Sequence, residues 1–243
     1  MLAWSLGELP AAPDLVFTML PGPAEVAETY LGAGGLLERL RPRHAMVDMT
    51  TSSPRLAADI AVRAAAVGID TLDAPVSGGP AAADQGTLSI MVGGATEALE
   101  RVEPVLACLG RSITHQGAPG SGQLTKAINQ ILVAATSVAV GHAFSLGAEA
   151  GLDPRSLLTS LRAGAAGSPL LDFLWERLER EDLTPGFKLE QLGKDIRIAS
   201  HELAERQLDS DLMKALLTTV EQAAARYGRT AGSQASGLLA TDT

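Results

Sequence analysis

The chain changes character near residue 118, and this change constrains its fold more than any other feature. Before that point, short runs rich in β-branched residues alternate with segments of helical pattern. After it, one helical segment follows another, and strand signals are nearly absent beyond Ile113. Strands that alternate with helices indicate a doubly wound α/β sheet. We therefore predict an α/β domain over residues 1–118 and an all-α domain over residues 119–243.

The predicted elements follow from hydrophobic periodicity and from helix and turn signals. In the first half, we expect strands at 15–19, 45–49, 69–74, 88–92 and 111–115, and helices at 24–31, 53–67 and 96–109. In the second half, we expect helices at 121–150, 153–162, 169–181, 188–206 and 208–227. The glycines at 117, 120 and 122 are interpreted as a flexible hinge. The small, polar tail from residue 230 is expected to fray.

Charge and composition limit the partners of the chain. Nineteen basic and 28 acidic residues give a formal net charge of −9. This balance disfavours nucleic acid or an anionic membrane as a partner, since either prefers a basic face. A small anionic substrate stays compatible with it, because a few local donors outweigh the average charge. Aromatic residues make up only 3% of the chain, so we expect an aliphatic core.

Three features bear on the location of the protein. The single cysteine, Cys108, forms no intrachain disulfide, which suits a reducing cytosol. The first ten residues lack the basic and apolar regions of a signal peptide. The most apolar helical stretch, residues 131–140, is shorter than the ~20 residues that a membrane span needs. We therefore expect a cytoplasmic protein.

The segment DAPVSGGPAAADQGTL at 73–88 holds a candidate anion site. It begins at the end of a predicted strand, and open α/β sheets bind substrates beyond the carboxyl ends of their strands. Gly78 and Gly79 allow a ligand to approach the backbone closely, and Ser77 adds a hydroxyl, so the three offer several donors to a carboxylate. A tight turn before the next helix explains the same residues without a ligand. Local features give the two interpretations about equal weight.

Lys126 is expected near the start of the long helix, inside an apolar run. Asn129 and Gln130 follow three and four residues later, which places all three on one helical face. A lysine partly removed from water there has a lowered pKa and donates a proton to a carbonyl oxygen. The alternative, favoured by local features alone, is a lysine that lies along apolar surface with its ammonium in water. A positive charge near a helix N-terminus is disfavoured by the helix dipole, which suggests that Lys126 is present for its chemistry.

Two further groups of residues, Lys194-Asp195 and the four histidines, by themselves give no sign of a site. Lys194-Asp195 is most simply an ion pair on a solvated helix face. The four histidines show no ligand spacing, and we predict no metal site.

Six landmarks occur in order along the chain. They are TMLP at 18–21, DMTT at 48–51 with Pro54, DAPVSGG at 73–79 with GTL at 86–88, MVGG at 91–94, GAPGSGQLTKAIN at 117–129, and Lys194-Asp195. Together they resemble the β-hydroxyacid dehydrogenase family, which includes 3-hydroxyisobutyrate dehydrogenases and tartronate semialdehyde reductases. The likeness covers essentially the whole chain. It implies a Rossmann-type first domain, then a helical domain like that of 6-phosphogluconate dehydrogenase. It also implies NAD or NADP as cofactor and a homodimer or homotetramer.

The resemblance implies a role for each candidate site residue. It implies that Lys126 is the general acid/base. It implies that the substrate carboxylate is bound by Ser77, Gly78 and Gly79. The residues implied to border the dinucleotide are Leu20, Pro21, Thr51 and Lys194, and Lys194 is implied to close over the nicotinamide. Many members carry Asn-Asn where this chain has Asn129-Gln130, which leaves open which amide contacts the substrate. Within the family, Asn-Gln together with AGAAGS at 163–168 and PGF at 185–187 is most similar to tartronate semialdehyde reductases. These reduce 2-hydroxy-3-oxopropanoate to glycerate.

The chain departs from the family at its front. Family members begin with a strand, a GxGxxG-type turn and a helix, whereas this sequence has no such turn, and GAGG at 32–35 does not join a strand to a helix. That turn supplies the pyrophosphate site at a helix N-terminus. We therefore expect an N-terminally truncated sheet, a fragment or a start at an internal methionine, and weak or absent dinucleotide binding.

Three functions are compatible with these residues. The leading hypothesis is an NAD(P)-dependent oxidoreductase acting on a small 2- or 3-hydroxy acid. The second is a non-catalytic binding or assembly module that keeps the acid pocket and the helical domain. The third is a lyase that uses Lys126 as a Schiff-base nucleophile. The presence of both Lys126 and Ser77 favours an enzyme, because a scaffold needs neither.

Overall fold

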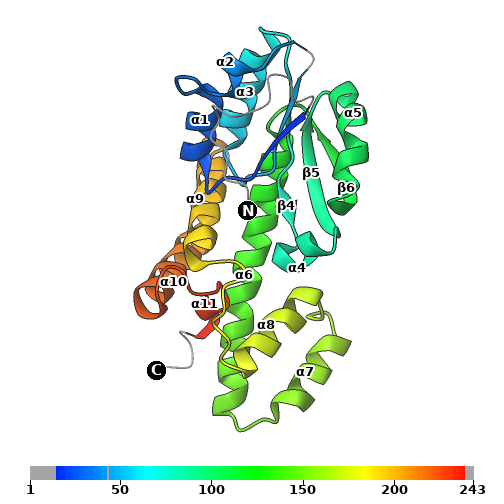
Figure 1. The fold of residues 1–243 in the computed structure, drawn as a ribbon. Helices are drawn as coiled ribbons and strands as arrows, with labels where there is room; N and C mark the ends of the chain where they lie inside the picture. The colour runs from blue at the N-terminus through cyan, green and yellow to red at the C-terminus, as the bar shows by residue number, and fades with distance from the viewer. Residues whose placement is uncertain (1–14, 43, 209, 239–243) are drawn as a thin grey trace. The chain divides into compact units, whose positions relative to one another are not determined.

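The computed structural model describes residues 15–42, 44–208 and 210–238. The opening segment, on which the targeting prediction rests, lies outside the described residues. Contacts divide the chain into two units, the first ending at Lys126 and the second beginning at Ala127. The helix α6 (Ser121–Glu149) starts in the first unit and continues into the second. Figure 1 shows the strands gathered in the first unit and helices alone in the second.

The described part of the first unit holds one mixed sheet. Its strands are β1 (Leu15–Thr18), β2 (Ala45–Asp48), β3 (Asp70–Asp73), β4 (Val76–Ser77), β5 (Leu88–Gly94) and β6 (Gly110–Gly117). The order is β1-β2-β3-β5-β4, with β6 also paired to β5. The first three strands are parallel, and β6 is parallel to β5, but β5 runs antiparallel to β3 and β4. The five predicted strands are confirmed; β4 was missed because two residues carry no periodic signal.

Helices cover both faces of this sheet (Figure 1). They are α1 (Pro23–Leu31), α2 (Leu36–Arg39), α3 (Pro54–Ala65), α4 (Gly79–Asp84) and α5 (Thr96–Leu106). Successive residues of β2 point to opposite faces: Met46 packs with α1, α2 and α3, whereas Val47 packs with α5. Ser53 caps α3 by accepting a hydrogen bond from the backbone N–H of Leu56 at 3.4 Å. This arrangement is the predicted doubly wound fold.

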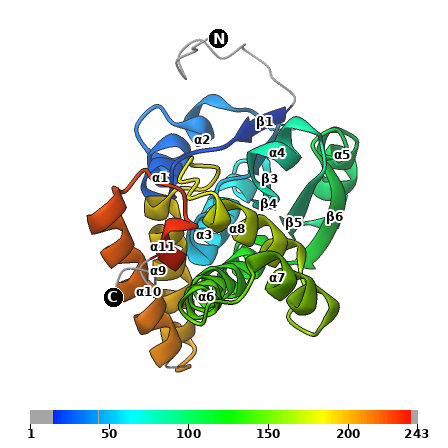
Figure 2. The same ribbon diagram turned by 90° about the horizontal axis from the view of Figure 1, so that it is seen from below.

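The second unit is helical within the described residues. After α6 come α7 (Pro154–Ala163), α8 (Pro169–Glu179), α9 (Leu189–Glu205), α10 (Asp211–Tyr227) and α11 (Ala235–Leu238). The helices α9 and α10 lie side by side and share an apolar cluster with α6 (Figures 1 and 2). A second cluster joins the far part of α6 to α8 around the buried Trp175. The five longer helices confirm the predicted ones to within a few residues.

The prediction of a frayed tail is wrong for the residues up to 238. The short helix α11 packs against α6, and a Cβ placed on Gly141 would lie 2.1 Å from the Cα of Gly237. The backbone N–H of Ser233 donates to the carbonyl of Phe187 at 2.7 Å. Small residues allow this close approach, which is why a composition that suggests mobility produces a buried segment instead.

The helix α6 is longer than the apolar stretch used to judge a membrane span. It has 29 residues, and an 18-residue window within it has a mean hydropathy of 1.7 and is 33% buried. By length and composition alone this helix is able to cross a membrane. The core helix of a soluble protein passes the same test, so the finding is weak evidence in either direction.

Candidate active site

The loops that follow β1 and β2 meet at the carboxyl edge of the sheet. The backbone N–H of Met49 donates to the carbonyl of Thr18 at 2.9 Å, and that of Leu20 donates to the Thr50 hydroxyl at 2.8 Å. Leu20 and Thr51 are half-buried here, and Pro21 is exposed. The structure thus brings together three of the four residues predicted to border a dinucleotide, because parallel neighbouring strands end at the same edge.

A buried carboxylate ends the next strand, β3. Asp73 is 4% exposed and accepts hydrogen bonds from the backbone N–H groups of Gly120, at 2.7 Å, and Gln123, at 2.8 Å. Burial raises the pKa of Asp73 to about 6, an effect opposed by these hydrogen bonds and reinforced by the charge of Asp48. The carboxylate therefore joins the strand end to the first turn of α6.

Gln123 joins the same turn to the loop after β2. Its amide oxygen accepts a hydrogen bond from the backbone N–H of Ser52 at 2.8 Å, and its amide nitrogen donates to the carbonyl of Thr50 at 2.7 Å. The side chain is 1% exposed. The beginning of α6 is therefore fixed to the ends of both β2 and β3.

The glycines near the start of α6 are packed rather than flexible. A Cβ on Gly122 would lie 2.4 Å from the carbonyl oxygen of Met91, and one on Gly120 would lie 2.6 Å from that of Pro54. A Cβ on Gly93 would lie 2.5 Å from the Asp73 carboxylate. The hinge interpretation is wrong at residues 120 and 122, because both positions serve the close approach of α6 to the sheet.

The predicted carboxylate-binding residues form an open turn. Ser77 ends β4 and is half-buried, and Gly78 and Gly79 are exposed with φ angles of 132° and 71°. Nothing lies within 4 Å of a Cβ placed on Gly79. The turn does precede a helix, α4, as the alternative interpretation expected, and its backbone also stays accessible to a small ligand.

Lys126 lies one turn beyond Gln123 on α6 and is 6% exposed. The structure therefore contradicts the alternative in which its ammonium lies in water. A buried lysine of this kind is a candidate proton donor.

The remaining predicted residues lie in the second unit. The Gln130 amide nitrogen donates to an Asp195 carboxylate oxygen at 2.7 Å, and the Asn129 amide donates to the Gln130 amide oxygen at 3.3 Å. The Lys194 ammonium lies 3.1 Å from the other Asp195 oxygen. The predicted ion pair is confirmed, but the solvated face is not, because Asp195 is only 1% exposed.

Asp73 and Gln123 stand in the motifs at 73–79 and 117–129, and the sequence alone predicts no role for either. Their partners are backbone groups 47 to 73 residues away, and no local pattern encodes such pairs. The glycines at 93 and 122 were the available signal, since glycine in a strand and at a helix start suggests close backbone approach.

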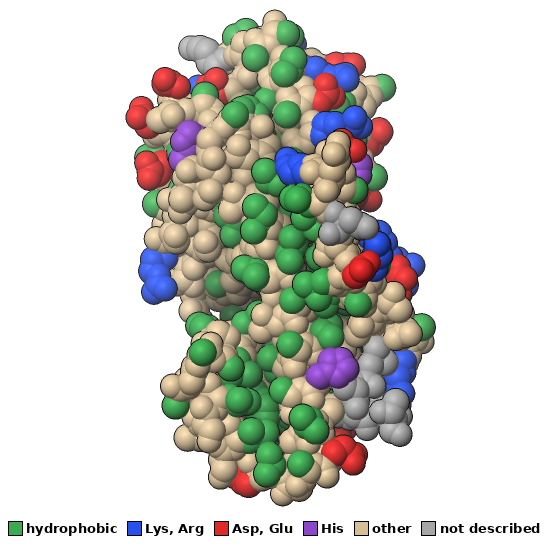
Figure 3. Space-filling model, turned by 180° about the vertical axis from the view of Figure 1, so that it is seen from behind, with side chains coloured by type: hydrophobic (Ala, Val, Ile, Leu, Met, Phe, Trp, Pro, Cys, Tyr) green, Lys and Arg blue, Asp and Glu red, His purple; other side chains and the backbone are tan. Residues whose placement is uncertain are grey.

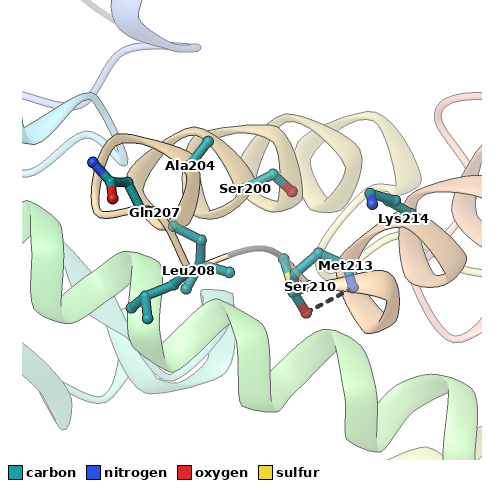
Figure 4. A pocket seen from close by; sticks show the side chains of 8 residues that line it. Ser200, Ala204, Gln207, Leu208, Ser210, Met213 and Lys214 are labelled. Carbon is teal, nitrogen blue, oxygen red and sulfur yellow. Dashed lines mark hydrogen bonds between the residues drawn. The ribbon is translucent and has the colours of Figure 1, made fainter.

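Two other features of the described residues concern metal binding and a pocket. No group of three or more His, Cys, Asp or Glu side chains among them is placed to hold a metal ion. A pocket of about 410 Å³ lies between α9 and α10, lined by Ser200, Leu203, Ala204, Gln207, Leu208, Ser210, Met213 and Lys214 (Figure 4). Its Ser210 hydroxyl caps α10 by accepting from the Met213 N–H at 3.4 Å. None of the predicted site residues lines it.

We expect Asp73 to make the protein less stable as the pH rises from about 4 to about 6. Its pKa is about 6 in the folded protein against an ordinary 3.8, so the folded state binds the proton more tightly. The resulting stabilisation is complete below the ordinary pKa and is lost as the pH rises through the folded pKa; it amounts to about 3 kcal/mol. Urea unfolding of wild type and Asp73→Asn across this range measures it. The same pH dependence in both proteins would contradict the prediction.

Comparison with known proteins adds family matches over both units. A model of the NAD binding domain of 6-phosphogluconate dehydrogenase matches residues 2–117. A model of the NAD-binding domain of NADP-dependent 3-hydroxyisobutyrate dehydrogenase matches residues 120–238.

Individual relatives agree with these matches. An uncharacterised oxidoreductase of Bacillus subtilis is 42% identical over 78% of the chain and 66% of its own length, and the 2-hydroxy-3-oxopropionate reductase of Escherichia coli is 39% identical over 77% and 64%. The chain thus spans just under two thirds of these two relatives. An uncharacterised oxidoreductase of Synechocystis is 34% identical over 95% of the chain and 79% of its own length. A solved 3-hydroxyisobutyrate dehydrogenase of Mycobacterium tuberculosis, with L-serine, has a TM-score of 0.84 and 29% identity, covering 93% of this chain and 79% of that one.

Proposed function

The chain belongs to the β-hydroxyacid dehydrogenase family of NAD(P)-dependent oxidoreductases, and we propose that it interconverts a small hydroxy acid and the corresponding semialdehyde. One observation carries the proposal. The buried Lys126 lies one turn past Gln123, on a helix fixed to the strand that leads into the open turn Ser77–Gly79. A proton donor and an anion-binding turn on one rigid framework are what this reaction needs.

The residues of the chain divide the work on the substrate. The Ser77 hydroxyl and the backbone N–H groups of Gly78 and Gly79 hold the carboxylate. Lys126 donates a proton to the carbonyl oxygen during reduction and takes the proton from the hydroxyl during oxidation. A bound nicotinamide dinucleotide supplies or accepts the hydride.

The loops after β1 and β2 are suited to border such a cofactor. Leu20, Pro21 and Thr51 lie at the carboxyl edge of parallel strands, where α/β sheets bind nucleotides. Beside Thr51, the Ser52 hydroxyl is buried and has no hydrogen-bond partner among the described residues. A buried hydroxyl in that state has capacity for a ligand. Lys194 stays a predicted cofactor residue from the second unit.

Asn129 is the amide that we propose contacts the substrate. Gln130 is 3% exposed, and both ends of its amide are already hydrogen-bonded, whereas Asn129 is half-buried. We expect Asn129→Ala to raise KM for the substrate about tenfold with little change in stability, in line with one lost hydrogen bond. Gln130→Ala is expected to destabilise the fold instead, because it leaves the buried Asp195 without that donor. Steady-state kinetics and thermal unfolding of both variants test this, and an unchanged KM in Asn129→Ala would contradict it.

Tartronate semialdehyde is the substrate that we propose first. The Asn-Gln pair after Lys126 supports it, and so does the 2-hydroxy-3-oxopropionate reductase among the relatives. A 3-hydroxyisobutyrate dehydrogenase of Pseudomonas aeruginosa, 36% identical, supports 3-hydroxyisobutyrate as the second choice. Both substrates have a propanoate backbone with an oxygen on C3; they differ at C2, which carries a hydroxyl in tartronate semialdehyde and a methyl group in 3-hydroxyisobutyrate.

The test is a fluorescence titration of the purified chain with NADH and NADPH, followed by assays with both substrates. We expect weak but saturable binding of one dinucleotide, because this sequence has no GxGxxG-type turn, and turnover of at least one substrate. A folded chain that binds neither dinucleotide nor substrate would overturn the proposal. Binding of the acid without any turnover would favour the binding-module hypothesis instead.

We further propose that the chain forms a homodimer through α6. Ile128, Leu132 and Leu146 are 54%, 67% and 72% exposed, and they recur with Ala139 and Ala143 at helical spacing along one face. Figure 3 shows exposed hydrophobic side chains on the face that it draws. Exposed apolar side chains that recur along one helix face are typical of a helix that packs against a partner.

Two charges on this stripe are expected to separate the protomers. The double variant Leu132→Glu and Leu146→Glu should sediment as a monomer in analytical ultracentrifugation while wild type sediments as a dimer or larger. Val62→Glu, a change at another exposed apolar residue on α3, is the matched control and should leave the mass unchanged. A wild-type protein that stays monomeric at all concentrations would contradict this proposal.

A further inference from the structure

The first turn of α6 is held by groups outside the helix. The N–H groups of a first helical turn have no partner within their own helix. Here the N–H of Gln123, in that turn, and the N–H of Gly120, which immediately precedes the helix, donate to the two oxygens of the Asp73 carboxylate at 2.8 and 2.7 Å. The positive end of the helix dipole also favours a negative group at this place. Because Asp73 is 4% exposed, water does not compete for these bonds.

Gln123 adds a second attachment from the same turn. Its amide receives the Ser52 N–H at 2.8 Å and donates to the Thr50 carbonyl at 2.7 Å. An amide that both donates and accepts has a single orientation that satisfies both partners. The first turn of α6 is therefore attached to the ends of two strands, and these attachments also fix the rotation of the helix about its own axis.

These attachments fix the position of Lys126 relative to the turn Ser77–Gly79. Lys126 follows Gln123 by three residues, so the two move together on one helical turn. On the other side, only Ala74, Pro75 and Val76 separate Asp73 from Ser77. That short segment is itself fixed to β5, because the Met91 N–H donates to the Pro75 carbonyl at 3.0 Å and Val76 pairs with Ile90. Asp73 is thus the shared anchor of both parts.

We propose that Asp73 and Gln123 are positioning residues, which hold the Lys126 ammonium at a fixed place relative to the turn Ser77–Gly79. The inference rests on the proposed function, in which Lys126 moves the proton. Proton transfer requires heavy atoms at hydrogen-bond distance, and a displacement of about 1 Å is enough to slow a reaction on the order of 100-fold. Neither residue needs to touch the substrate for this role.

The test compares Asp73→Asn and Gln123→Met with a matched control, Asp153→Asn. Asp153 also caps a helix, accepting from the Ser156 N–H at 2.8 Å, but its helix, α7, carries none of the proposed site residues. We expect kcat per folded molecule to fall on the order of 10-fold to 100-fold in the two site variants, with KM within about threefold of wild type. Asp153→Asn should keep both constants. A merely structural role would lower the amount of folded protein without changing kcat per folded molecule.

A second readout needs neither cofactor nor turnover. Acetic anhydride labels lysines according to their accessibility, and mass spectrometry reports each site separately. We expect Lys126 to be labelled several times faster in both site variants than in wild type, with Lys214 as the internal reference, whose side chain is 63% exposed. Gln123→Glu, which keeps the acceptor for Ser52 and loses the donor to Thr50, replaces Gln123→Met if that variant does not fold, and the same acceleration is expected.

The two proposals fail in different ways. Wild-type kcat together with unchanged Lys126 labelling in folded site variants would overturn the positioning role, whatever the substrate. A wild-type chain that turns over no hydroxy acid would overturn the proposed function, and the labelling experiment would still decide whether Asp73 and Gln123 position Lys126.

Discussion

Replacement of Lys126 by methionine is expected to lower kcat by about 10²-fold to 10⁴-fold, the contribution of a positioned general acid. Methionine keeps the length and apolar character of the stem, so it suits a side chain that is 6% exposed and leaves the helix in place. KM should change little, because the carboxylate is held by Ser77–Gly79. Steady-state kinetics over a range of pH measure the effect, and circular dichroism checks the fold. Lys214→Met, at an exposed lysine on α10, is the control and should retain wild-type kcat.

The alternatives for Lys126 give different results in the same set of experiments. Activity that survives Lys126→Met would remove the lysine from the mechanism. A lyase that forms a Schiff base would be trapped on Lys126 by borohydride in the presence of substrate, and the adduct would appear by mass spectrometry. We expect no adduct, because an acid/base lysine forms no covalent bond with the substrate.

Replacement of Gly122 by alanine is expected to cost about 3 kcal/mol of folding stability and to lower Tm by about 10 °C. Two effects oppose each other at this helical position. Helix propensity favours alanine over glycine by about 1 kcal/mol. The added Cβ, however, would lie 2.4 Å from the carbonyl oxygen of Met91 and 2.6 Å from that of Asp73, and both obstacles are backbone. The clash outweighs propensity because backbone in a paired strand has little room to move.

The clash at residue 122 should also affect catalysis. If α6 shifts to relieve it, Lys126 shifts too, and we expect a fall in kcat on the order of 100-fold in the protein that still folds. Gly164→Ala is the matched control, since its Cβ would meet nothing closer than 3.7 Å. Thermal unfolding and kinetics of the two variants decide the matter. A Gly122→Ala protein as stable as wild type would mean that the sheet adapts and that the packing is looser than the structure indicates.

Most elements of the fold could be predicted from local patterns. Alternating β-branched runs produced the five longer strands, and signals such as Ser53-Pro54 and Asp153-Pro154 located the helix starts correctly. Short elements such as β4 and α11 were missed, because they owe their existence to pairing and packing rather than to their own sequence. The antiparallel run of β5 against β3 could not be predicted from the sequence, since strand direction is a property of the whole sheet.

The sequence by itself determined the chemistry available to this protein. Ser77-Gly78-Gly79 and Lys126 can be read directly from short stretches of sequence. A resemblance to a family that rests on such motifs can therefore be recognised without knowing which residues are in contact. Only the tertiary structure decided what holds these residues in place. Asp73 reaches Gly120 and Gln123 across about 50 residues of chain, Gln123 reaches back to Ser52, and Gly93 and Gly122 make room for both. The physical reason is that burial turns a carboxylate and an amide into fixed partners of particular backbone groups, and burial exists only once the chain has folded.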